Sequence, residues 1–215
     1  MQSEIILWII IGLNVLFSWK GFEDLTFFRT YEFHMGSILS GDQKRMISSG
    51  FLHADIAHLA FNMLALYSFG EVIIQTFGNV FFITTYFSSL LLGNLLTVYF
   101  HRNNYGYRAV GASGAVTGIL YSAILMYPHM QISLFFIPIG IPAYIFGFIY
   151  LLYSIYGMKA QNDNIGHTAH IGGALAGFAF TLFQAPSLFY TNTFIVFLLL
   201  IPIILLFILA QRGKL

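Results

Sequence analysis

Residues 111–118 read GASGAVTG and residues 169–173 read AHIGG, and each stretch lies near the start of a long apolar segment. The first stretch carries Ser113 and the second carries His170. A hydroxyl nucleophile and an imidazole base are costly inside hydrocarbon unless they meet each other or another polar group. The two stretches therefore predict that their segments pack together and that Ser113 and His170 share one function.

The composition is that of an integral membrane protein. Apolar residues make up 58% of the 215 residues and charged residues only 8%, with a mean hydropathy of +0.80. A soluble domain usually carries about 25% charged residues. The net charge of +1 offers no basic surface for nucleic acid, and the absence of cysteine excludes disulfides and thiol chemistry. We expect a lipid bilayer around the protein and no nucleic-acid partner.

Seven apolar segments approach the length of about 20 residues that a helix needs to cross a bilayer. We therefore predict an all-α, polytopic transmembrane helical bundle in a single membrane-embedded domain, residues 1–215. The first segment has no basic flank before it and no clear small-residue cleavage site after it, so we expect a retained helix rather than a signal peptide. The segments cover about residues 4–19, 56–77, 79–100, 112–127, 141–157, 167–185 and 191–210.

Two connecting regions differ from simple short loops. Residues 132–139 are apolar and could extend either neighbouring helix, but Pro138 and Pro142 favour a break there. Residues 20–55 form a long, charged first loop, and a loop of this length usually has a function or a structure of its own. Its apolar residues 25–28 favour a place in the membrane interface, and a solvated connector is an equally good interpretation.

Four polar residues fall at similar depth. Consecutive spans alternate in direction, so the second, fourth and sixth apolar segments begin at the same membrane face. His58 and Asn62 lie in the first turns of the second segment, Ser113 at the start of the fourth, and His170 about one turn into the sixth. The order of the segments therefore predicts that these four side chains lie near one another.

Glycine spacing supports the same arrangement. Gly114 and Gly118 are four residues apart, and so are Gly173 and Gly177. Small residues at this spacing allow membrane helices to approach each other closely. Taken singly, each feature has a simpler explanation, because such glycines are ordinary packing devices, the histidine could be structural and the serine could bond back to its own helix. The combined pattern favours a functional pair.

A serine hydroxyl becomes nucleophilic when a neighbouring base takes its proton, and histidine does this near neutral pH. We therefore expect Ser113 to be the nucleophile and His170 the general base. Most serine hydrolases add a carboxylate that orients the imidazole. Of the eight acidic residues, only Glu71 lies well inside an apolar segment, about four turns beyond His58 and toward the opposite face. The sequence therefore predicts a two-residue dyad.

The tetrahedral intermediate of such a reaction needs donors for its oxyanion. The start of a helix provides free backbone N–H groups, so the Ser113 backbone is one candidate. His58 and Asn62 project from one helix face, and each can donate through its side chain. Asn62 could instead hold two helices together. His53 could support the site from the loop, or could simply be an interfacial histidine.

Two other chemistries are disfavoured. His167 and His170 are three residues apart, but the zinc-protease motif His-Glu-x-x-His is absent, and the nearest acid in the sequence is Asp163, in the preceding loop. An intramembrane aspartyl protease would need two aspartates inside helices, whereas all the aspartates of this chain fall in loops. We expect no metal ion and no cofactor.

With these residues in place, the sequence resembles the rhomboid family of intramembrane serine proteases. The matching motifs lie within about residues 46–185. They are His53-x-x-x-x-His58-Leu59-Ala60-Phe61-Asn62, then Gly111-Ala112-Ser113-Gly114, then Ala169-His170-Ile171-Gly172-Gly173. The resemblance implies that Ser113 is the nucleophile and His170 the general base. It also implies that the oxyanion is stabilised by His58, Asn62 and the Ser113 backbone, with Gly111, Gly114 and His53 in supporting positions.

The resemblance implies a six-helix core, to which the segment at about 191–210 adds a seventh, C-terminal helix. It implies hydrolysis of peptide bonds in or next to the transmembrane helices of single-span or polytopic membrane proteins, without metal or cofactor. A membrane-embedded first loop and a mobile cap at residues 158–166 are further expectations. The alternative is an inactive rhomboid-like protein that binds transmembrane helices, but such proteins typically lack the serine or the histidine. A transporter would need ionisable residues at mid-depth, where only Glu71 qualifies.

Two positions depart from the family pattern. Thr117 stands where some bacterial members have a tyrosine that stacks on the catalytic histidine, so the ring of His170 must be held in another way. The Trp-Arg pair of many first loops is absent, and we do not expect Arg45-Met46 to replace it.

The resemblance favours a bacterial inner membrane, with the active site toward the extracytoplasmic face. The basic residues favour the opposite orientation, because all nine fall on the side of the active-site loops and the positive-inside rule would place that side in the cytoplasm. We follow the family, since long loops escape the charge rule and acidic residues alternate with the basic ones here.

Overall fold

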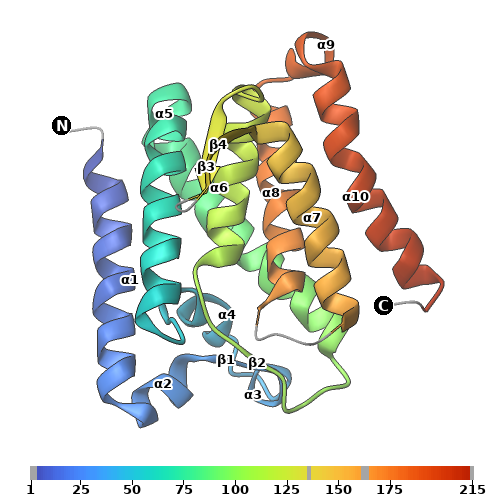
Figure 1. Cartoon of the computed structure of the whole chain (residues 1–215). Helices are drawn as coiled ribbons and strands as arrows, with labels where there is room; N and C mark the ends of the chain where they lie inside the picture. The colour runs from blue at the N-terminus through green and yellow to red at the C-terminus, as the bar shows by residue number, and fades with distance from the viewer. Residues whose placement is uncertain (1–3, 135–136, 161–164, 214–215) are drawn as a thin grey trace.

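The protein is described here from a computed structural model, and the described residues are 4–134, 137–160 and 165–213. Six larger helices stand side by side in a bundle, and the short elements α2, β1, α3, α4 and β2 gather at one end of it (Figure 1). The larger helices are α1 (Ile5–Glu23), α5 (Ile56–His101), α6 (Ser113–Met126), α7 (Ala143–Ala160), α8 (His167–Gln184) and α10 (Thr193–Gln211).

Each of the seven apolar segments coincides with helical structure. The second and third segments are the two halves of α5, which are separated by a non-helical backbone at Gly78, with φ 84° and ψ 174°. Among the described residues, three helices (α1, α5 and α10) are long and apolar enough to cross a membrane, and α6 is a shorter apolar helix. An all-α membrane protein is therefore supported, and the count of six core helices plus a seventh stays a prediction.

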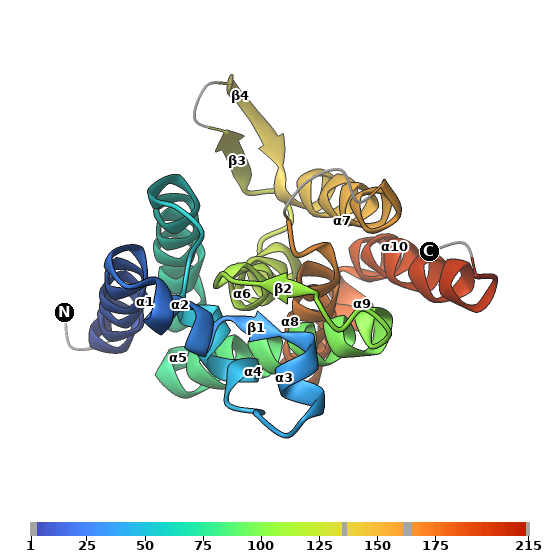
Figure 2. The same ribbon diagram turned by 90° about the horizontal axis from the view of Figure 1, so that it is seen from below.

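The helix that carries Ser113 lies at the centre of the bundle. Every residue of α6 from Gly114 to Leu125 is buried, and Figure 2 shows α5, α7 and α8 arranged around it. The outer helices instead present large apolar side chains outward, such as Leu16 with 67% of its surface exposed and Val80 with 77%. An apolar exterior around a buried central helix suits lipid as the surrounding solvent.

The first loop is built from short ordered elements. They are α2 (Leu25–Tyr31), β1 (Phe33–His34), α3 (Met35–Leu39), α4 (Arg45–Ser48) and η2 (Ser49–Phe51). Strand β1 pairs antiparallel with β2 (Arg108–Ala109), Phe33 standing opposite Ala109. Because β2 leads directly into the turn before Ser113, the loop is fastened to the chain that enters α6.

Arg45 connects several parts of this loop by hydrogen bonds, and the expectation that it does not replace the Trp-Arg pair of the family stays a prediction. The Arg45 side chain is buried, and its guanidinium donates to the carbonyl oxygens of Arg29 at 2.8 Å and Glu32 at 2.9 Å. It also donates to the Asp42 carboxylate at 2.8 Å. The five donors of a guanidinium allow one side chain to satisfy several loop acceptors at once.

The apolar region between α6 and α7 extends neither helix. It forms an antiparallel hairpin of β3 (Gln131–Leu134) and β4 (Ile137–Pro142), in which Gln131 stands opposite Pro142. The prolines indicated a break here, but the strands were not predicted. The hairpin projects from the bundle between the first half of α5 and α7 (Figure 2). A short helix, α9 (Leu188–Thr191), connects α8 to α10.

Candidate active site

Ser113 is the first residue of α6, and His170 lies in the first turn of α8. The Ser113 Oγ and His170 Nε2 atoms are 2.7 Å apart, which is a hydrogen-bond distance. His170 is buried, whereas Ser113 is partly exposed. The structure thus brings together the two residues that the sequence paired across the chain.

The second ring nitrogen of His170 faces Tyr150 of α7. His170 Nδ1 lies 2.9 Å from the Tyr150 hydroxyl, and the two rings stack with centroids 5.6 Å apart and planes at 24°. The Tyr150 hydroxyl also lies 3.3 Å from the hydroxyl of Thr117, the residue that departs from the family pattern. The His170 ring is therefore held by a tyrosine from another helix. Sequence reasoning missed Tyr150, because nothing in the chain distinguishes it from the other aromatic residues of α7.

Ser113 follows a turn that requires glycine. Gly111 has a φ of 128°, a conformation that side-chain-bearing residues rarely adopt. A Cβ at this position would lie 2.7 Å from Cε1 of His58, so the missing side chain also makes room for the imidazole. The Gly111 N–H donates to the carbonyl of Ser49 at 3.0 Å, which ties the turn to the first loop.

His58 and Asn62 of α5 both lie close to the start of α6, where Ser113 stands. The Ala54 backbone N–H donates to His58 Nδ1 at 3.5 Å, so the ring carries its proton on Nε2. Asn62 lines the same cavity as Ser113, and its amide donates to the carbonyl of His58 at 2.9 Å. An amide group has two N–H donors, so the bond within α5 leaves a second donor for another acceptor. Both side chains thus carry donors beside Ser113.

His53 supports the turn from the loop before α5. The Ser18 hydroxyl donates to the Phe51 carbonyl at 3.0 Å and lies 2.8 Å from His53 Nδ1, which must therefore carry the proton. His53 Nε2 then accepts from the Ala112 backbone N–H at 3.4 Å. Burial is the main cause that lowers the pKa of His53, to about 3. The neutral ring therefore persists at physiological pH.

A cavity of about 580 Å³ opens beside Ser113. Its walls come from the first half of α5, from α6, from the β3–β4 hairpin and from α7, and Tyr150 forms part of them. Apolar side chains dominate the lining, among them Phe61, Leu64, Phe69, Val116, Leu120 and Phe146. This volume lies within the range of ligand-binding clefts in proteins, about 300–1,000 Å³.

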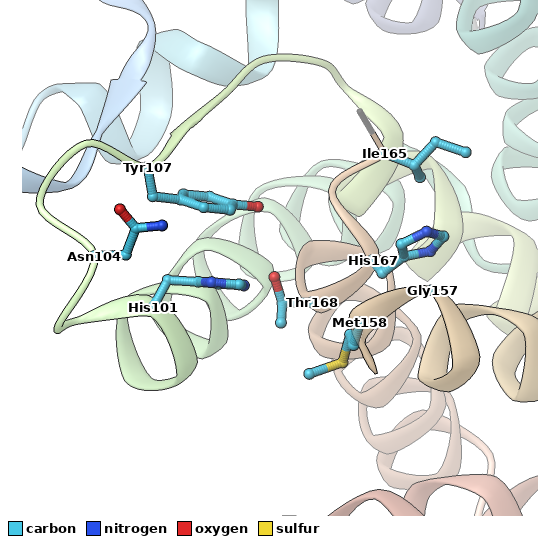
Figure 3. Close-up of a pocket in the computed structure, with 8 residues that line it drawn as sticks. All are labelled: His101, Asn104, Tyr107, Gly157, Met158, Ile165, His167 and Thr168. Carbon is cyan, nitrogen blue, oxygen red and sulfur yellow. The ribbon is translucent and has the colours of Figure 1, made fainter. Parts of the chain in front are cut away.

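A second pocket, of about 120 Å³, lies beside the start of α8 (Figure 3). On one side the ring of His101 stacks on Tyr107, with centroids 4.0 Å apart, and His167 lies on the other side. Burial raises the pKa of Tyr107. The His167 and His170 rings meet edge to face at 6.1 Å. Within the part of the chain that the structure describes, no three His, Cys, Asp or Glu side chains are grouped as metal ligands.

Glu71 is the acidic residue that the sequence places well inside an apolar segment. Glu71 accepts a hydrogen bond from Gln75 at 3.0 Å, one turn further along its own helix. Asp163, together with residues 161–164 of the expected cap, lies outside the described residues. Among the described residues, the ring nitrogens of His170 face Ser113 and Tyr150, the His167 ring meets it edge to face, and Thr117 lies next to Tyr150.

The residues of this site fall within a region of the chain that matches a known protein family. The chain matches the Rhomboid domain family over residues 40–187. The RHOMBOID-like protein 12, mitochondrial, of Arabidopsis thaliana is 30% identical over 182 residues, or 77% of this chain and 54% of that protein. Rhomboid protein 1, mitochondrial, of Saccharomyces cerevisiae is 30% identical over 135 residues, or 61% of this chain and 39% of that protein. Rhomboid protease GluP of Bacillus subtilis is 33% identical over 141 residues, or 66% of this chain and 26% of that protein.

These relatives differ from this chain in length, and two of them are mitochondrial. The chain spans about half or less of the length of the three relatives named above. The mitochondrial relatives conflict with the expectation of a bacterial inner membrane, and what the apolar helices support is an integral membrane protein. The family match includes all three motifs around His58, Ser113 and His170. This chain belongs to the rhomboid family.

Proposed function

We propose that this protein is a serine endopeptidase that hydrolyses peptide bonds in or next to the transmembrane helices of other membrane proteins. The observation that carries the proposal is the distance of 2.7 Å between Ser113 Oγ and His170 Nε2, at the wall of an apolar cavity. The rhomboid family match supports it, and so does the similarity to a Bacillus subtilis relative that is named a rhomboid protease.

The proposed reaction begins when His170 Nε2 takes the proton of Ser113 and Oγ attacks the scissile carbonyl carbon. The carbonyl oxygen becomes an oxyanion, and its proposed donors are the Ser113 backbone N–H and the side chains of His58 and Asn62. His170 then protonates the leaving amine, the C–N bond breaks and an ester remains on Ser113. A water molecule, deprotonated by His170, hydrolyses this ester and releases the carboxylate product.

The proposed substrate is a locally unwound, apolar segment of a single-span or polytopic membrane protein. In an intact helix the carbonyl groups are engaged in hydrogen bonds to N–H groups four residues later. Unwinding frees a carbonyl for attack by Ser113, while the apolar cavity between α5 and α7 receives the neighbouring side chains. No metal ion or cofactor takes part in these steps. The membrane face on which the site opens stays a prediction.

Ser113→Ala and His170→Ala test the dyad. The wild type is expected to react covalently with a fluorophosphonate probe and to cleave a transmembrane peptide reconstituted with it, and both variants are expected to do neither. Thermal unfolding in detergent checks that the variants are folded, and Ser187→Ala, at an exposed serine outside the cavity, is the control. Cleavage by Ser113→Ala would overturn the proposed nucleophile.

An inactive rhomboid-like protein is the alternative that this experiment distinguishes. Such a protein would bind the transmembrane peptide without cleaving it, and the wild type would be as unreactive toward the fluorophosphonate as Ser113→Ala. That result would refute the proposed protease activity, although the family assignment would stand.

A further inference from the structure

A closed cycle of hydrogen bonds begins and ends at Ser113. It runs through three hydroxyl groups and one imidazole. The Thr117 hydroxyl donates to the Ser113 carbonyl at 2.7 Å, one turn earlier in α6. The same Thr117 oxygen lies 3.3 Å from the Tyr150 hydroxyl, which lies 2.9 Å from His170 Nδ1. His170 Nε2 completes the cycle at 2.7 Å from Ser113 Oγ.

The Ser113 carbonyl fixes the direction of every hydrogen bond in this cycle. A carbonyl oxygen accepts only, so the single proton of the Thr117 hydroxyl is used for the bond to Ser113. Tyr150 must then donate its proton to the Thr117 oxygen. Since that proton is used in turn, the Tyr150 oxygen accepts from His170, and Nδ1 must carry the imidazole hydrogen.

This direction has a chemical consequence for His170. A neutral imidazole carries one hydrogen, so a proton on Nδ1 leaves Nε2 as the acceptor. Nε2 is the nitrogen that faces Ser113 Oγ, and only an acceptor there can take the serine proton. We infer that Tyr150 and Thr117 are positioning residues that select the base-competent tautomer of His170, with the Ser113 carbonyl as the fixed end of the chain of bonds.

The inference rests on the proposed function, because the tautomer of His170 matters only if His170 acts as the base. In many serine hydrolases a carboxylate holds the tautomer of the base. Among the described residues, the neutral phenol of Tyr150 has that task, and a phenol requires no buried charge among apolar helices. Thr117, which departs from the family pattern, then has a positioning role, because its hydroxyl orients the phenol of Tyr150.

Nuclear magnetic resonance of the full chain in detergent micelles tests the tautomer directly. With ¹⁵N-labelled histidine, long-range couplings between ring protons and nitrogens distinguish an Nδ1–H ring from an Nε2–H ring, and the spectrum of His170→Ala identifies the signals of His170. The wild type is expected to show the Nδ1–H form. In Tyr150→Phe, which keeps the stacked ring and loses the hydroxyl, the ratio of Nδ1–H to Nε2–H is expected to fall about tenfold, the equivalent of one neutral hydrogen bond.

Kinetics give a second readout. Tyr150→Phe and Thr117→Val are each expected to lower kcat for a transmembrane peptide about tenfold with little change in KM, because the cavity keeps its shape. Thr117→Ser restores the hydroxyl and is expected to restore kcat. Tyr156→Phe, at an exposed position of α7, and Thr181→Val, which loses the same kind of bond within α8, are the controls.

Several results would overturn the inference. They are an Nε2–H ring in the wild type, a tautomer ratio that is unchanged in Tyr150→Phe, or a Thr117→Val variant that behaves as the wild type does. If Tyr150→Phe fails to fold, the wild-type spectrum and Thr117→Val still decide. Failure of the proposed function is distinguishable, because a wild type that never reacts with the fluorophosphonate still reports its tautomer in the spectrum.

Discussion

The backbone carbonyl of Gly114 occupies the space in which a side chain at Gly173 would begin, so α6 and α8 cross in direct backbone contact. Gly118 and Gly177 repeat this contact one turn further along both helices. Only such a close crossing allows the short side chain of Ser113 to reach an imidazole on another helix. The glycine spacing therefore explains why the dyad forms.

Gly173→Ala is expected to lower the free energy of unfolding by at least about 2 kcal/mol, because the new methyl group collides with the backbone of α6 and not with a movable side chain. The same variant should lose fluorophosphonate labelling as α6 and α8 separate. Thermal unfolding in detergent and probe labelling measure both effects. Gly12→Ala, at a glycine of α1 with open space around it, is the control. A wild-type unfolding temperature would show that the crossing is not tight.

Gly111→Ala separates two kinds of strain. Gly111 and Gly41 both have a positive φ, 128° and 104°, but only a methyl group at Gly111 would meet a neighbour, the ring of His58. Both alanine variants should be destabilised by about 1–2 kcal/mol, the cost of the unfavourable backbone conformation. Gly111→Ala alone should also lose peptide cleavage, measured as kcat/KM. Equal activities of the two variants would argue against a role for the contact with His58.

Asn62→Ala is expected to lower kcat about 100-fold to 1,000-fold, the usual effect of losing one oxyanion donor. KM for the peptide should change little, because the donor acts on the transition state. Asn192→Ala removes an amide that donates to the Leu125 carbonyl outside this cavity and should keep its kcat. An unchanged kcat in Asn62→Ala would remove Asn62 from the proposed site and leave it with a structural role in α5.

The lowered pKa of His53 predicts that the folded protein loses stability in acid. Its pKa is lowered from 6.5 to about 3 in the folded protein, mainly by burial, so between these values the unfolded chain binds more protons. The contribution of the neutral ring to stability is complete above about pH 6.5 and is lost as the pH falls, by up to ~1.4 kcal/mol per unit. His53→Gln should flatten the decline of the unfolding temperature between about pH 7 and 4.5. His129→Gln, at an exposed histidine, should keep the wild-type slope.

Arg45→Gln is expected to destabilise the first loop by about 2–4 kcal/mol, because two backbone carbonyls and the Asp42 carboxylate lose a buried donor. Limited proteolysis between residues 24 and 52, together with thermal unfolding, measures this change. Lys44→Gln removes a neighbouring exposed charge and should have little effect. If the two variants are cleaved at the same rate, the loop does not depend on Arg45.

Much of the site could be predicted from the chain alone. Long apolar segments identify membrane helices because the bilayer imposes a length and an apolar surface on each one separately. Ser113 and His170 are conspicuous for the same reason, since each interrupts an apolar segment. The alternation of spans then places their ends, with His58 and Asn62, at one face. All these features are properties of single segments or of their order.

Only the tertiary structure decided which side chains meet across segments. Tyr150 reaches His170 because α7 packs beside α8, and the pattern along α7 does not reveal that neighbour. Arg45 finds its acceptors and His53 finds the Ala112 N–H only when the first loop folds under the bundle. The β3–β4 hairpin likewise depends on pairing between two strands. Hydropathy records how each segment meets lipid or core, whereas directional hydrogen bonds depend on the relative placement of several segments.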